Sequence, residues 1–349
     1  MMPALRWLNG HEHILSIHRL TSEVWLSVAG SSRLTLSRGC HILRVMTPSP
    51  QVAVVVVSYN TRDLLISCLS SVIESKSPAD VEIVVVDNAS NDGSLDTVRD
   101  TYPQIMTIAN PSNLGFAVAC NQAIRASTAP FILLLNSDAT ITPESFQALY
   151  ETMSANAQCG AAGCRIVNSA GLETTNTRNF LTPFNQALEQ AGVMGGIHWK
   201  YLVRSYRPTP DQNELDCSID WIDGACLMIR RAALDEVGLF DEDFFIYSED
   251  EDLCFRLRSR GWTICYSAKG IARHHGAAST SQNRFEMLRH FYSSQMLFLS
   301  KHRGRASAFL YAIAMKTVLF LKASLVGDRT RRETAREQLR ALRKARAGK

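Results

Sequence analysis

Residues 52–60 read VAVVVVSYN, an uninterrupted apolar run followed by three polar residues. Continuous β-branched runs are typical of strands that are buried on both faces of a parallel sheet, whereas half-exposed strands alternate apolar and polar residues. Apolar residues with helical spacing follow at 64–73, and a second apolar run, VEIVVVDN, occupies 81–88. The pattern therefore predicts a strand, a helix and a parallel neighbouring strand, which is the beginning of an α/β fold.

This alternation continues to about residue 280. A short helix is expected from residue 94, a longer helix at 115–127, and another buried strand at 131–138 with the sequence FILLLNSD. Strands and helices in this order are typical of a doubly wound, mainly parallel sheet with helices on both faces. The predicted α/β domain spans residues 52–280.

The segments outside this domain differ from it in composition. Residues 1–45 read as short alternating strands broken by Gly and Ser, and residues 46–51 (MTPSPQ) read as a linker. The first segment is either a small β-rich extension or a mis-assigned start, in which case Met46 is the initiator. Amphipathic helices are expected at 281–326, and a basic tail with nine Lys/Arg against three Asp/Glu at 327–349.

The composition restricts the classes of function. Apolar residues make up 46% of the 349 residues and charged residues 20%, which is typical of an ordinary folded protein. The basic tail accounts for the net charge of +4, so the rest of the chain is slightly acidic and we expect no nucleic-acid partner. Nine cysteines without CxxC spacing indicate free thiols in a reducing compartment, and no signal-peptide pattern opens the chain. We therefore expect a cytoplasmic location.

The apolar segment near the end of the chain allows two interpretations. Residues 306–326 (ASAFLYAIAMKTVLFLKASLV) are interrupted by Lys316 and Lys322, whereas a transmembrane helix needs about 20 predominantly apolar residues. The segment suits a peripheral helix on an anionic membrane surface, at the inner face of the cell membrane. It equally suits an amphipathic helix packed on the protein body, followed by a solvated basic tail.

Polar residues follow three of the predicted strands, at 58–60, 87–88 and 136–138. Ligands of open α/β sheets bind outside the carboxyl ends of the strands, so these residues are expected to form one wall of a site. Neither a GxxxxGK[ST] nor a GxGxxG loop follows the first strand, so a nucleotide would need other contacts. A metal ion that joins its diphosphate to Asp138 is one such contact.

A cluster of four consecutive carboxylates, residues 249–252, occurs in FFIYSEDEDLCFRLRSRGW. The segment SEDE has the form of a capping box with Ser248 as the N-cap, and a helix N-terminus stabilises each nearby anion by about 0.3–1 kcal/mol. Helix capping does not explain all four acids. Glu249 and Asp252 share a helix face while Asp250 points elsewhere, so Asp250 is a candidate general base.

Two histidines, His274 and His275, follow the predicted strand WTICYS. A neutral imidazole near Asp138 could complete a metal site, and a pair of surface histidines is the alternative.

Six segments in this order resemble a known family: VVVVSYN, VEIVVVDNASNDGS, NLGFAVACNQAI, FILLLNSDA, WIDGACLMIRRAALDEVGLFDEDFFIYSEDEDLCFRLRSRGW and HHGAAS. They are similar to family 2 glycosyltransferases of the GT-A fold. Among these, they most resemble the rhamnosyltransferase-like subgroup, which builds bacterial surface polysaccharides. The resemblance covers about residues 52–280.

This resemblance implies site residues and a cofactor. The nucleotide-binding residues would be Ser58, Tyr59, Asn60, Asp87, Asn113, Gly115 and Asn136. Asp138 and His274 would hold Mg²⁺ or Mn²⁺, and Asn136 stands where the family's DxD element has its first carboxylate. Asp250 matches the catalytic base. The acceptor would be bound by Trp221, Gly224 and Glu249.

The resemblance also implies an activity. The enzyme would be an inverting glycosyltransferase that moves a sugar from a nucleotide-diphosphate donor to a hydroxyl of a glycan or lipid-linked acceptor, with dTDP-rhamnose as the expected donor. The alternative is a catalytically degenerate sugar-nucleotide-binding protein, an interpretation that Asn136 invites. A nucleotidyltransferase shares a similar sheet, but it would need a Gly-rich triphosphate loop after the first strand.

Overall fold

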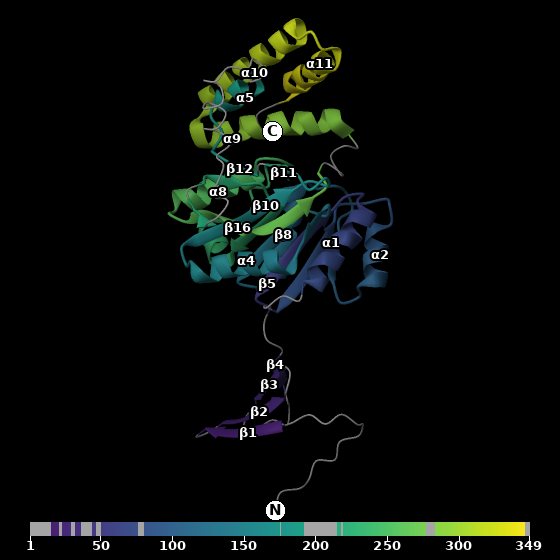
Figure 1. Ribbon diagram of the computed structural model, residues 1–349, viewed down its shortest axis with the longest axis vertical. Coiled ribbons are helices and arrows are strands. Elements are labelled where there is room, and N and C mark those ends of the chain that lie inside the picture. Colours follow the sequence, from purple (N-terminus) through teal and green to yellow (C-terminus); the bar gives the residue numbers. More distant parts are fainter. Residues whose placement is uncertain are drawn as a thin grey trace, which may run out of the picture. The chain divides into compact units, whose positions relative to one another are not determined.

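The computed structural model contains two compact units, Met1–Pro50 and Gln51–Lys349. It describes residues 50–75, 80–174, 176–191, 217, 219–276 and 283–345 in full, and otherwise only the backbone of five short strands. Four of these strands form an antiparallel sheet in the first unit, with neighbours in chain order (Figure 1). They are β1 (Leu15–Leu20), β2 (Glu23–Val28), β3 (Ser32–Thr35) and β4 (Arg44–Met46). That this unit is a module of its own stays a prediction.

A large mixed sheet forms the centre of the second unit (Figure 1). Its main strands are β5 (Val52–Ser58), β6 (Val81–Asp87), β7 (Met106–Ala109), β8 (Phe131–Leu135), β10 (Cys159–Val167), β13 (Leu215–Asp216), β15 (Cys226–Arg230) and β16 (Thr263–His274). They lie in the order β13-β16-β10-β15-β8-β5-β6-β7. The first half of the domain is parallel, as its apolar runs predict, because β5 pairs with β6 and β8, and β6 pairs with β7.

The second half of the sheet contains antiparallel pairs. β15 lies between β8 and β10 and runs antiparallel to both, because the chain enters β15 opposite the end of β8. The short strand β9 (Ala139–Ile141) pairs with the end of β16. Three two-residue strands complete the set: β11 (Glu173–Thr174) pairs with β10, and β12 (Thr177–Arg178) pairs with β14 (Trp221–Ile222). The α/β fold is thus confirmed, with a mixed sheet.

Helices cover both faces of the sheet. One face packs against α1 (Arg62–Glu74), α2 (Ser94–Thr101) and α4 (Pro143–Ala155), and the other against α3 (Phe116–Ala126), α7 (Arg231–Val237) and α8 (Glu249–Ser259). Strand β5 supplies both cores, since Val54 packs on the first face and Val55 on the second. Burial on both faces explains why this strand is apolar without interruption.

The C-terminal helices form most of a third core, to which Leu181 and Phe244 also contribute. It contains α5 (Asn185–Ala191), α9 (Arg284–Arg303), α10 (Arg305–Leu325) and α11 (Arg329–Lys344), which lie together in Figure 1. The expected basic tail therefore contains a helix. Ala335, Leu339 and Leu342 of α11 are buried at helical spacing, and this apolar stripe holds the basic segment against α10 and α9.

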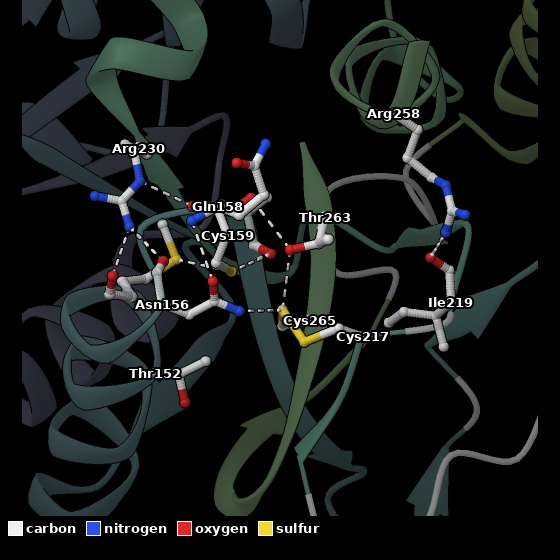
Figure 2. Close-up of a disulfide and its surroundings, with 12 residues drawn as sticks. Thr152, Asn156, Gln158, Cys159, Cys217, Ile219, Arg230, Arg258, Thr263 and Cys265 are labelled. Atoms are coloured by element: carbon white, nitrogen blue, oxygen red, sulfur yellow. Dashed lines mark hydrogen bonds between the residues drawn. A yellow bond between two sulfur atoms is a disulfide. The ribbon is translucent and has the colours of Figure 1, made fainter. Parts of the chain in front are cut away.

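Figure 2 shows a disulfide between Cys217 and Cys265, which are 48 residues apart in the chain. The expectation that all cysteines are free thiols is wrong for this pair, because the pairing of β13 with β16 brings two distant cysteines together. Six further cysteines in the described part of the chain are free, and all six are buried.

Candidate active site

A cavity of about 970 Å³ opens at the carboxyl ends of β5 and β8 and extends to the C-terminal helices. Ten of the predicted site residues line it: Tyr59, Asn113, Gly115, Asn136, Asp138, Trp221, Gly224, Glu249, Asp250 and His274. Three others, Ser58, Asn60 and Asp87, are not among the lining residues. The structure thus brings the two acids Asp138 and Asp250, 112 positions apart in the sequence, to one cavity together with His274.

Asp138 and His274 form a pair at the edge of the sheet. The backbone explains their proximity, because β9 begins directly after Asp138 and its Ala139 lies opposite His274 of β16. Nε2 of His274 is 3.0 Å from Oδ1 of Asp138 and 3.4 Å from Nδ2 of Asn136. The two side chains are held by strands rather than by free loops, so their separation is defined by the sheet.

The Asp138–His274 pair offers an oxygen and a nitrogen ligand of the kind that divalent cations accept. Within the described residues, no group of three or more His, Cys, Asp or Glu side chains is arranged to hold a metal. Mg²⁺ commonly takes only one or two protein carboxylates and completes its coordination with water and substrate phosphates. Asp138 and His274 therefore offer a partial site that a diphosphate would complete.

Two of the predicted nucleotide-binding residues shape the loops behind the cavity. Oδ2 of Asp87, at the end of β6, accepts a hydrogen bond of 2.9 Å from the backbone N–H of Ser90. Its Oδ1 is buried without a hydrogen-bond partner. Asn60 has a left-handed backbone with φ of 53°, and its Oδ1 accepts a 2.7 Å hydrogen bond from the backbone N–H of Asn91. Leaving a buried carboxylate oxygen without a hydrogen-bond donor lowers the stability of the fold. Oδ1 of Asp87 is such an oxygen in this structure.

Ser58 connects the ends of β5 and β8. It is fully buried, and its Oγ is 3.1 Å from the Oγ1 of Thr61, which donates to the Oγ of Ser137 at 2.9 Å. This chain of hydroxyls fixes the turn that precedes Asp138. Ser58 therefore stabilises the turn before Asp138 and does not itself line the cavity.

Gly115 allows a close contact between two walls of the cavity. A Cβ at this position would lie 2.6 Å from the carbonyl oxygen of Phe245, and the φ of Gly115 is +92°. The same carbonyl accepts a 2.7 Å hydrogen bond from the backbone N–H of Phe116. A side chain at 115 would therefore separate the start of α3 from the segment that leads to α8.

The backbone before α8 is unusual at two consecutive residues. Tyr247 and Ser248 have φ values of 71° and 62°, and each non-glycine residue in this region costs about 1–3 kcal/mol. Ser248 makes no side-chain capping bond, so the expected capping box is wrong. The carboxylate of Glu251 instead accepts a 2.6 Å hydrogen bond from the backbone N–H of Leu181. Because the N-cap residue Ser248 has a left-handed backbone, the side chains at the start of α8 are not positioned to make the usual capping hydrogen bonds.

Asp250 is held in the cavity by backbone donors. Its Oδ2 accepts a 2.8 Å hydrogen bond from the N–H of Gly224, and its Oδ1 accepts one of 2.8 Å from the N–H of Glu251. Burial, and then the nearby carboxylate of Asp223, raise the pKa of Asp250 from 3.8 to about 6, against the opposing effect of the two N–H donors and of Arg178. The carboxyl therefore exchanges a proton near neutral pH.

The neighbouring acids are deeply buried. Glu249 is 5% exposed, its Oε2 has no hydrogen-bond partner, and burial followed by the charge of Asp250 raises its pKa well above 4.5. Burial also raises the pKa of Glu251, to about 8. Asp252 is paired instead, with Nε of Arg256 at 2.8 Å and Nε2 of His302 at 2.7 Å.

Further lining residues are absent from the sequence-based prediction. Arg178 and Asp223 form a 3.3 Å ion pair at the cavity, and α5 and α9 supply a wall of polar and aromatic side chains. The helical spacing of polar residues along 283–295 is the sequence pattern from which this face of α9 could be predicted. No sequence pattern predicts the ion pair. Arg178 lies on β12 and Asp223 just after β14, and these two strands become neighbours only when the chain folds.

Comparison with known proteins identifies the class. The family model for glycosyl transferase family 2 matches residues 53–238, and the chain belongs to this family. Together with the mixed sheet, this makes the protein a glycosyltransferase enzyme of the hexosyltransferase kind, with the GT-A fold. The nucleotidyltransferase interpretation is thereby set aside.

Among curated relatives, the chain is similar to the N-acetylglucosaminyl-diphospho-decaprenol L-rhamnosyltransferase of Mycobacterium tuberculosis. The two are 28% identical over 280 residues, which cover 72% of this chain and 87% of the relative. The low-salt glycan biosynthesis hexosyltransferase Agl10 of Haloferax volcanii is 25% identical over 252 residues, which cover 70% of this chain and 73% of the relative. The chain is thus rhamnosyltransferase-like within family 2.

Two solved structures share the fold. The mannosyltransferase PcManGT of Pyrobaculum calidifontis, in complex with GDP-Man and Mn²⁺, has a TM-score of 0.54 at 17% identity, covering 85% of this chain and 87% of its own. GalNAc-T7 with UDP, GalNAc and Mn²⁺ has a TM-score of 0.54 at 15% identity, covering 87% of this chain and 57% of its own.

Proposed function

We propose that this glycosyltransferase inverts the anomeric centre and uses Asp250 as its general base. The observation that carries the proposal is the meeting of Asp250 with the Asp138–His274 pair in one cavity. The acceptor hydroxyl gives its proton to the Asp250 carboxylate while its oxygen forms the new bond to the anomeric carbon. The bond from this carbon to the donor phosphate breaks, and the nucleoside diphosphate leaves with the electron pair.

The pKa of Asp250 supports this role. A general base is most effective when its pKa lies near the working pH. The pKa of about 6 meets this condition, because the carboxyl is ionised at neutral pH and is still basic enough to take a proton. The backbone donors from Gly224 and Glu251 hold both carboxylate oxygens in place.

Asp138 and His274 are proposed as the protein ligands of Mg²⁺ or Mn²⁺. When bound, the metal would neutralise charge on the leaving diphosphate. Both structural neighbours described above contain Mn²⁺, which supports a divalent ion in this fold. The amide of Asn136 lies 3.4 Å from His274. Asn136 is therefore a neutral neighbour of the two proposed metal ligands, at a position where a carboxylate would add negative charge.

The nucleotide is proposed to bind along Tyr59, Asn113, Gly115 and Asn136, all of which line the cavity. Asp87 is proposed to face the base, as the family resemblance implies. It does not line the cavity in this structure and its Oδ1 is buried, so this contact requires a shift of the loop after β6. Ser58 and Asn60 act in this proposal through the loops that they hold. Trp221, Gly224 and Glu249 are proposed to line the acceptor side next to Asp250.

We propose dTDP-rhamnose as the donor and a glycan or lipid-linked sugar as the acceptor, in bacterial surface polysaccharide synthesis. The name of the mycobacterial relative supports both, since it specifies rhamnosyl transfer to N-acetylglucosaminyl-diphospho-decaprenol. The domain at 52–280 would carry the transfer, and residues 281–349 would add the acceptor side and a membrane contact.

The membrane contact is proposed for α10. Among the described residues, α10 is the helix that is long and apolar enough to cross a membrane, and only 28% of its apolar window is buried. Because its Tyr311, Met315 and Leu319 pack against the enzyme, we propose that it lies along the inner face of the cell membrane instead. Its exposed apolar side chains are Phe309, Leu310, Ile313, Phe320, Leu321 and Leu325.

Asp250→Asn tests the catalytic proposal. An amide keeps the shape and can still accept from the Gly224 N–H but takes no proton, so transfer should fall by about 100- to 10,000-fold, while nucleotide binding and the thermal midpoint stay close to wild type. Asp100→Asn, at an exposed position on α2, is the control and should retain full activity. Unchanged turnover in Asp250→Asn would remove Asp250 from the mechanism.

The donor is tested by a thermal-shift screen of nucleotide sugars with and without Mg²⁺ or Mn²⁺. A ligand that binds only the folded state raises the midpoint according to its concentration relative to its Kd. We expect the largest shift with dTDP-rhamnose plus metal, and loss of its metal-dependent part in Asp138→Asn. A larger shift with a uridine sugar would reassign the donor. A full set of shifts without any transfer would favour the degenerate binding protein.

A further inference from the structure

The wall of the cavity that α5 and α9 supply has a regular construction. The lining residues on α5 are Gln186, Glu189 and Gln190, and those of α9 with its N-cap are Asn283, Glu286, Met287, His290, Phe291 and Gln295. Both sets follow the three- and four-residue spacing of a single helix face. The face on α9 extends from Asn283 to Gln295, a rise of about 18 Å at 1.5 Å per residue.

This wall is polar although it faces inward. On the same helices, Ala187, Met296 and Leu299 are buried in the apolar C-terminal core. Each helix therefore presents an apolar face to the core and a face rich in amides and carboxylates to the cavity. Most of the lining residues are partly exposed, and Gln186 and Gln295 are the buried ones. An amide offers more hydrogen-bonding positions than one hydroxyl can satisfy, so these two buried amides are the part of the wall that indicates a polar ligand.

Two of the amides are fixed by a hydroxyl from a third helix. The Oη of Tyr311 on α10 lies 2.8 Å from Oε1 of Gln186 and also contacts Oε1 of Gln295. Tyr311 is fully buried, and the two glutamines are 5% and 4% exposed. Both contacts are made by an amide oxygen, which accepts from the hydroxyl, and the hydroxyl has one proton to share between the two. The NH₂ groups of both amides are therefore left to donate to other partners.

The charge of this wall is nearly balanced. Its lining residues on α5 and α9 include the carboxylates Glu189 and Glu286 but neither lysine nor arginine, and Glu286 is paired with Nε of Arg289 at 2.7 Å. A wall without excess positive charge suits hydroxyl groups, which hydrogen-bond to amides and carboxylates, better than a diphosphate. Phe291 also lines the wall, and the ring of His290 stacks on Phe245 at 4.5 Å, which gives flat surfaces for the C–H face of a ring.

We propose that the wall formed by α5 and α9 is a subsite for a sugar ring of the acceptor. In this subsite Gln186 and Gln295 bond the ring hydroxyls, and Tyr311 is a positioning residue that holds both amides. The inference rests on the proposed transfer reaction and adds the residues that choose its acceptor. It also gives the C-terminal helices a part in the active site, although α9 lies beyond the residues matched by the family model.

The test uses the full chain with dTDP-rhamnose and metal, and measures nucleoside diphosphate release. The acceptor probes are N-acetylglucosaminyl-diphospho-farnesol and the octyl β-glycosides of N-acetylglucosamine, glucose, galactose and mannose. For any probe that accelerates release, Gln186→Ala and Gln295→Ala should each raise the acceptor KM about five-fold, as expected for one lost hydrogen bond. The donor KM and the slow donor hydrolysis without acceptor should not change.

Tyr311→Phe separates positioning from folding. It should raise the acceptor KM by about two- to five-fold without a change in donor KM, whereas a purely structural defect would alter both substrates and the thermal midpoint. Gln338→Ala, on α11 and outside the cavity lining, is the matched control and should behave as wild type.

Three outcomes have distinct meanings. An unchanged acceptor KM in both glutamine variants, or an equal rise in donor KM, would overturn the subsite. A wild-type enzyme that hydrolyses its donor but is accelerated by no probe would also overturn it, because no sugar ring then binds productively there. A protein that neither binds nor hydrolyses any nucleotide sugar with metal would instead contradict the proposed function.

Discussion

At the scale of single residues, the four acids at the start of α8 occupy four different environments. Asp250 bonds two backbone N–H groups in the cavity, Glu249 is buried with an unpaired oxygen, Glu251 bonds the N–H of Leu181, and Asp252 is bonded to Arg256 and His302. Burial raises the pKa of Glu249 and of Glu251, so neutral acids relieve part of the repulsion that four adjacent charges would produce.

The pKa of Asp250 predicts the pH dependence of transfer. Asp250, as the proposed base, acts only when it is ionised, so kcat/KM should rise with pH, reach half its maximum near pH 6 and then level off. Burial raises this pKa most and the charge of Asp223 raises it further, whereas the N–H donors of Gly224 and Glu251 and the charge of Arg178 lower it. The measurement is a profile of kcat/KM against pH with saturating metal.

Two variants make this profile decisive. Asp223→Asn removes the charge that raises the pKa of Asp250, so the midpoint should move to lower pH. The residual rate of Asp250→Asn should show no inflection near pH 6. A wild-type midpoint near the ordinary aspartate value of 3.8 would contradict the account of a buried base.

At the scale of elements, α8 is tied to the sheet and to the C-terminal helices at once. Asp252 joins Arg256 on its own helix to His302 on α9, and Arg256 also donates to the carbonyls of Val237 and Leu239. Asp252 is 1% exposed, so these bonds are shielded from water. The link holds the helix that carries Asp250 in a fixed position against α9.

His302→Ala tests this link. Loss of a hydrogen bond to a buried carboxylate should lower the free energy of unfolding by about 1.5–3 kcal/mol, because Asp252 keeps Arg256 as its other partner. The measurement is denaturant unfolding of the variant and of wild type at neutral pH. His275→Ala, at an exposed position just after β16, is a matched control. Equal stability of His302→Ala and wild type would show that the link contributes little.

At the scale of the whole molecule, the C-terminal helices combine an apolar surface with positive charge. The exposed side of α10 includes Phe309 and Phe320, which are 66% and 56% exposed. Next to it, α11 has seven Lys/Arg against two Asp/Glu, and Lys316 and Arg343 line one groove of about 300 Å³ with Phe320 and Leu321. Apolar side chains beside cations suit the surface of an anionic bilayer.

This surface predicts binding to vesicles. The full chain should float with vesicles that contain anionic phospholipid, and less with purely zwitterionic ones or at high salt. Phe309→Ser combined with Phe320→Ser should reduce the bound fraction by about ten-fold or more, since two aromatic side chains that would be buried in the bilayer interface are lost. Leu172→Ser, at a position that is 66% exposed but remote in sequence from α10, is the control. Equal flotation of the double variant would refute the membrane contact.

Much of the fold could be predicted from local pattern. The runs at 52–58, 81–87 and 131–135 are apolar without interruption because strands β5, β6 and β8 are central and covered on both faces. Likewise, Asn136 and Asp138 were placed correctly at a strand end that lines the cavity. These features depend on neighbours in sequence, so the sequence pattern reveals them.

Other features depended on contacts between distant segments. The capping box failed because a left-handed Ser248 and the N–H of Leu181 outcompeted local capping. The disulfide requires the pairing of β13 with β16, and the Arg178–Asp223 pair requires β12 beside β14. Such contacts leave no periodic signal in the chain.

The sequence by itself determined the α/β class, the family and the residues that carry charge, because apolar periodicity and strand-end polarity are local properties. Only the tertiary structure decided what those charges do. Burial and the donors of Gly224 and Glu251 set the protonation of Asp250, and the pairing of β9 with β16 brought His274 to Asp138. The reason is physical: a pKa and the distance between two side chains depend on the surroundings of an atom in space, which the fold creates from segments far apart in the chain.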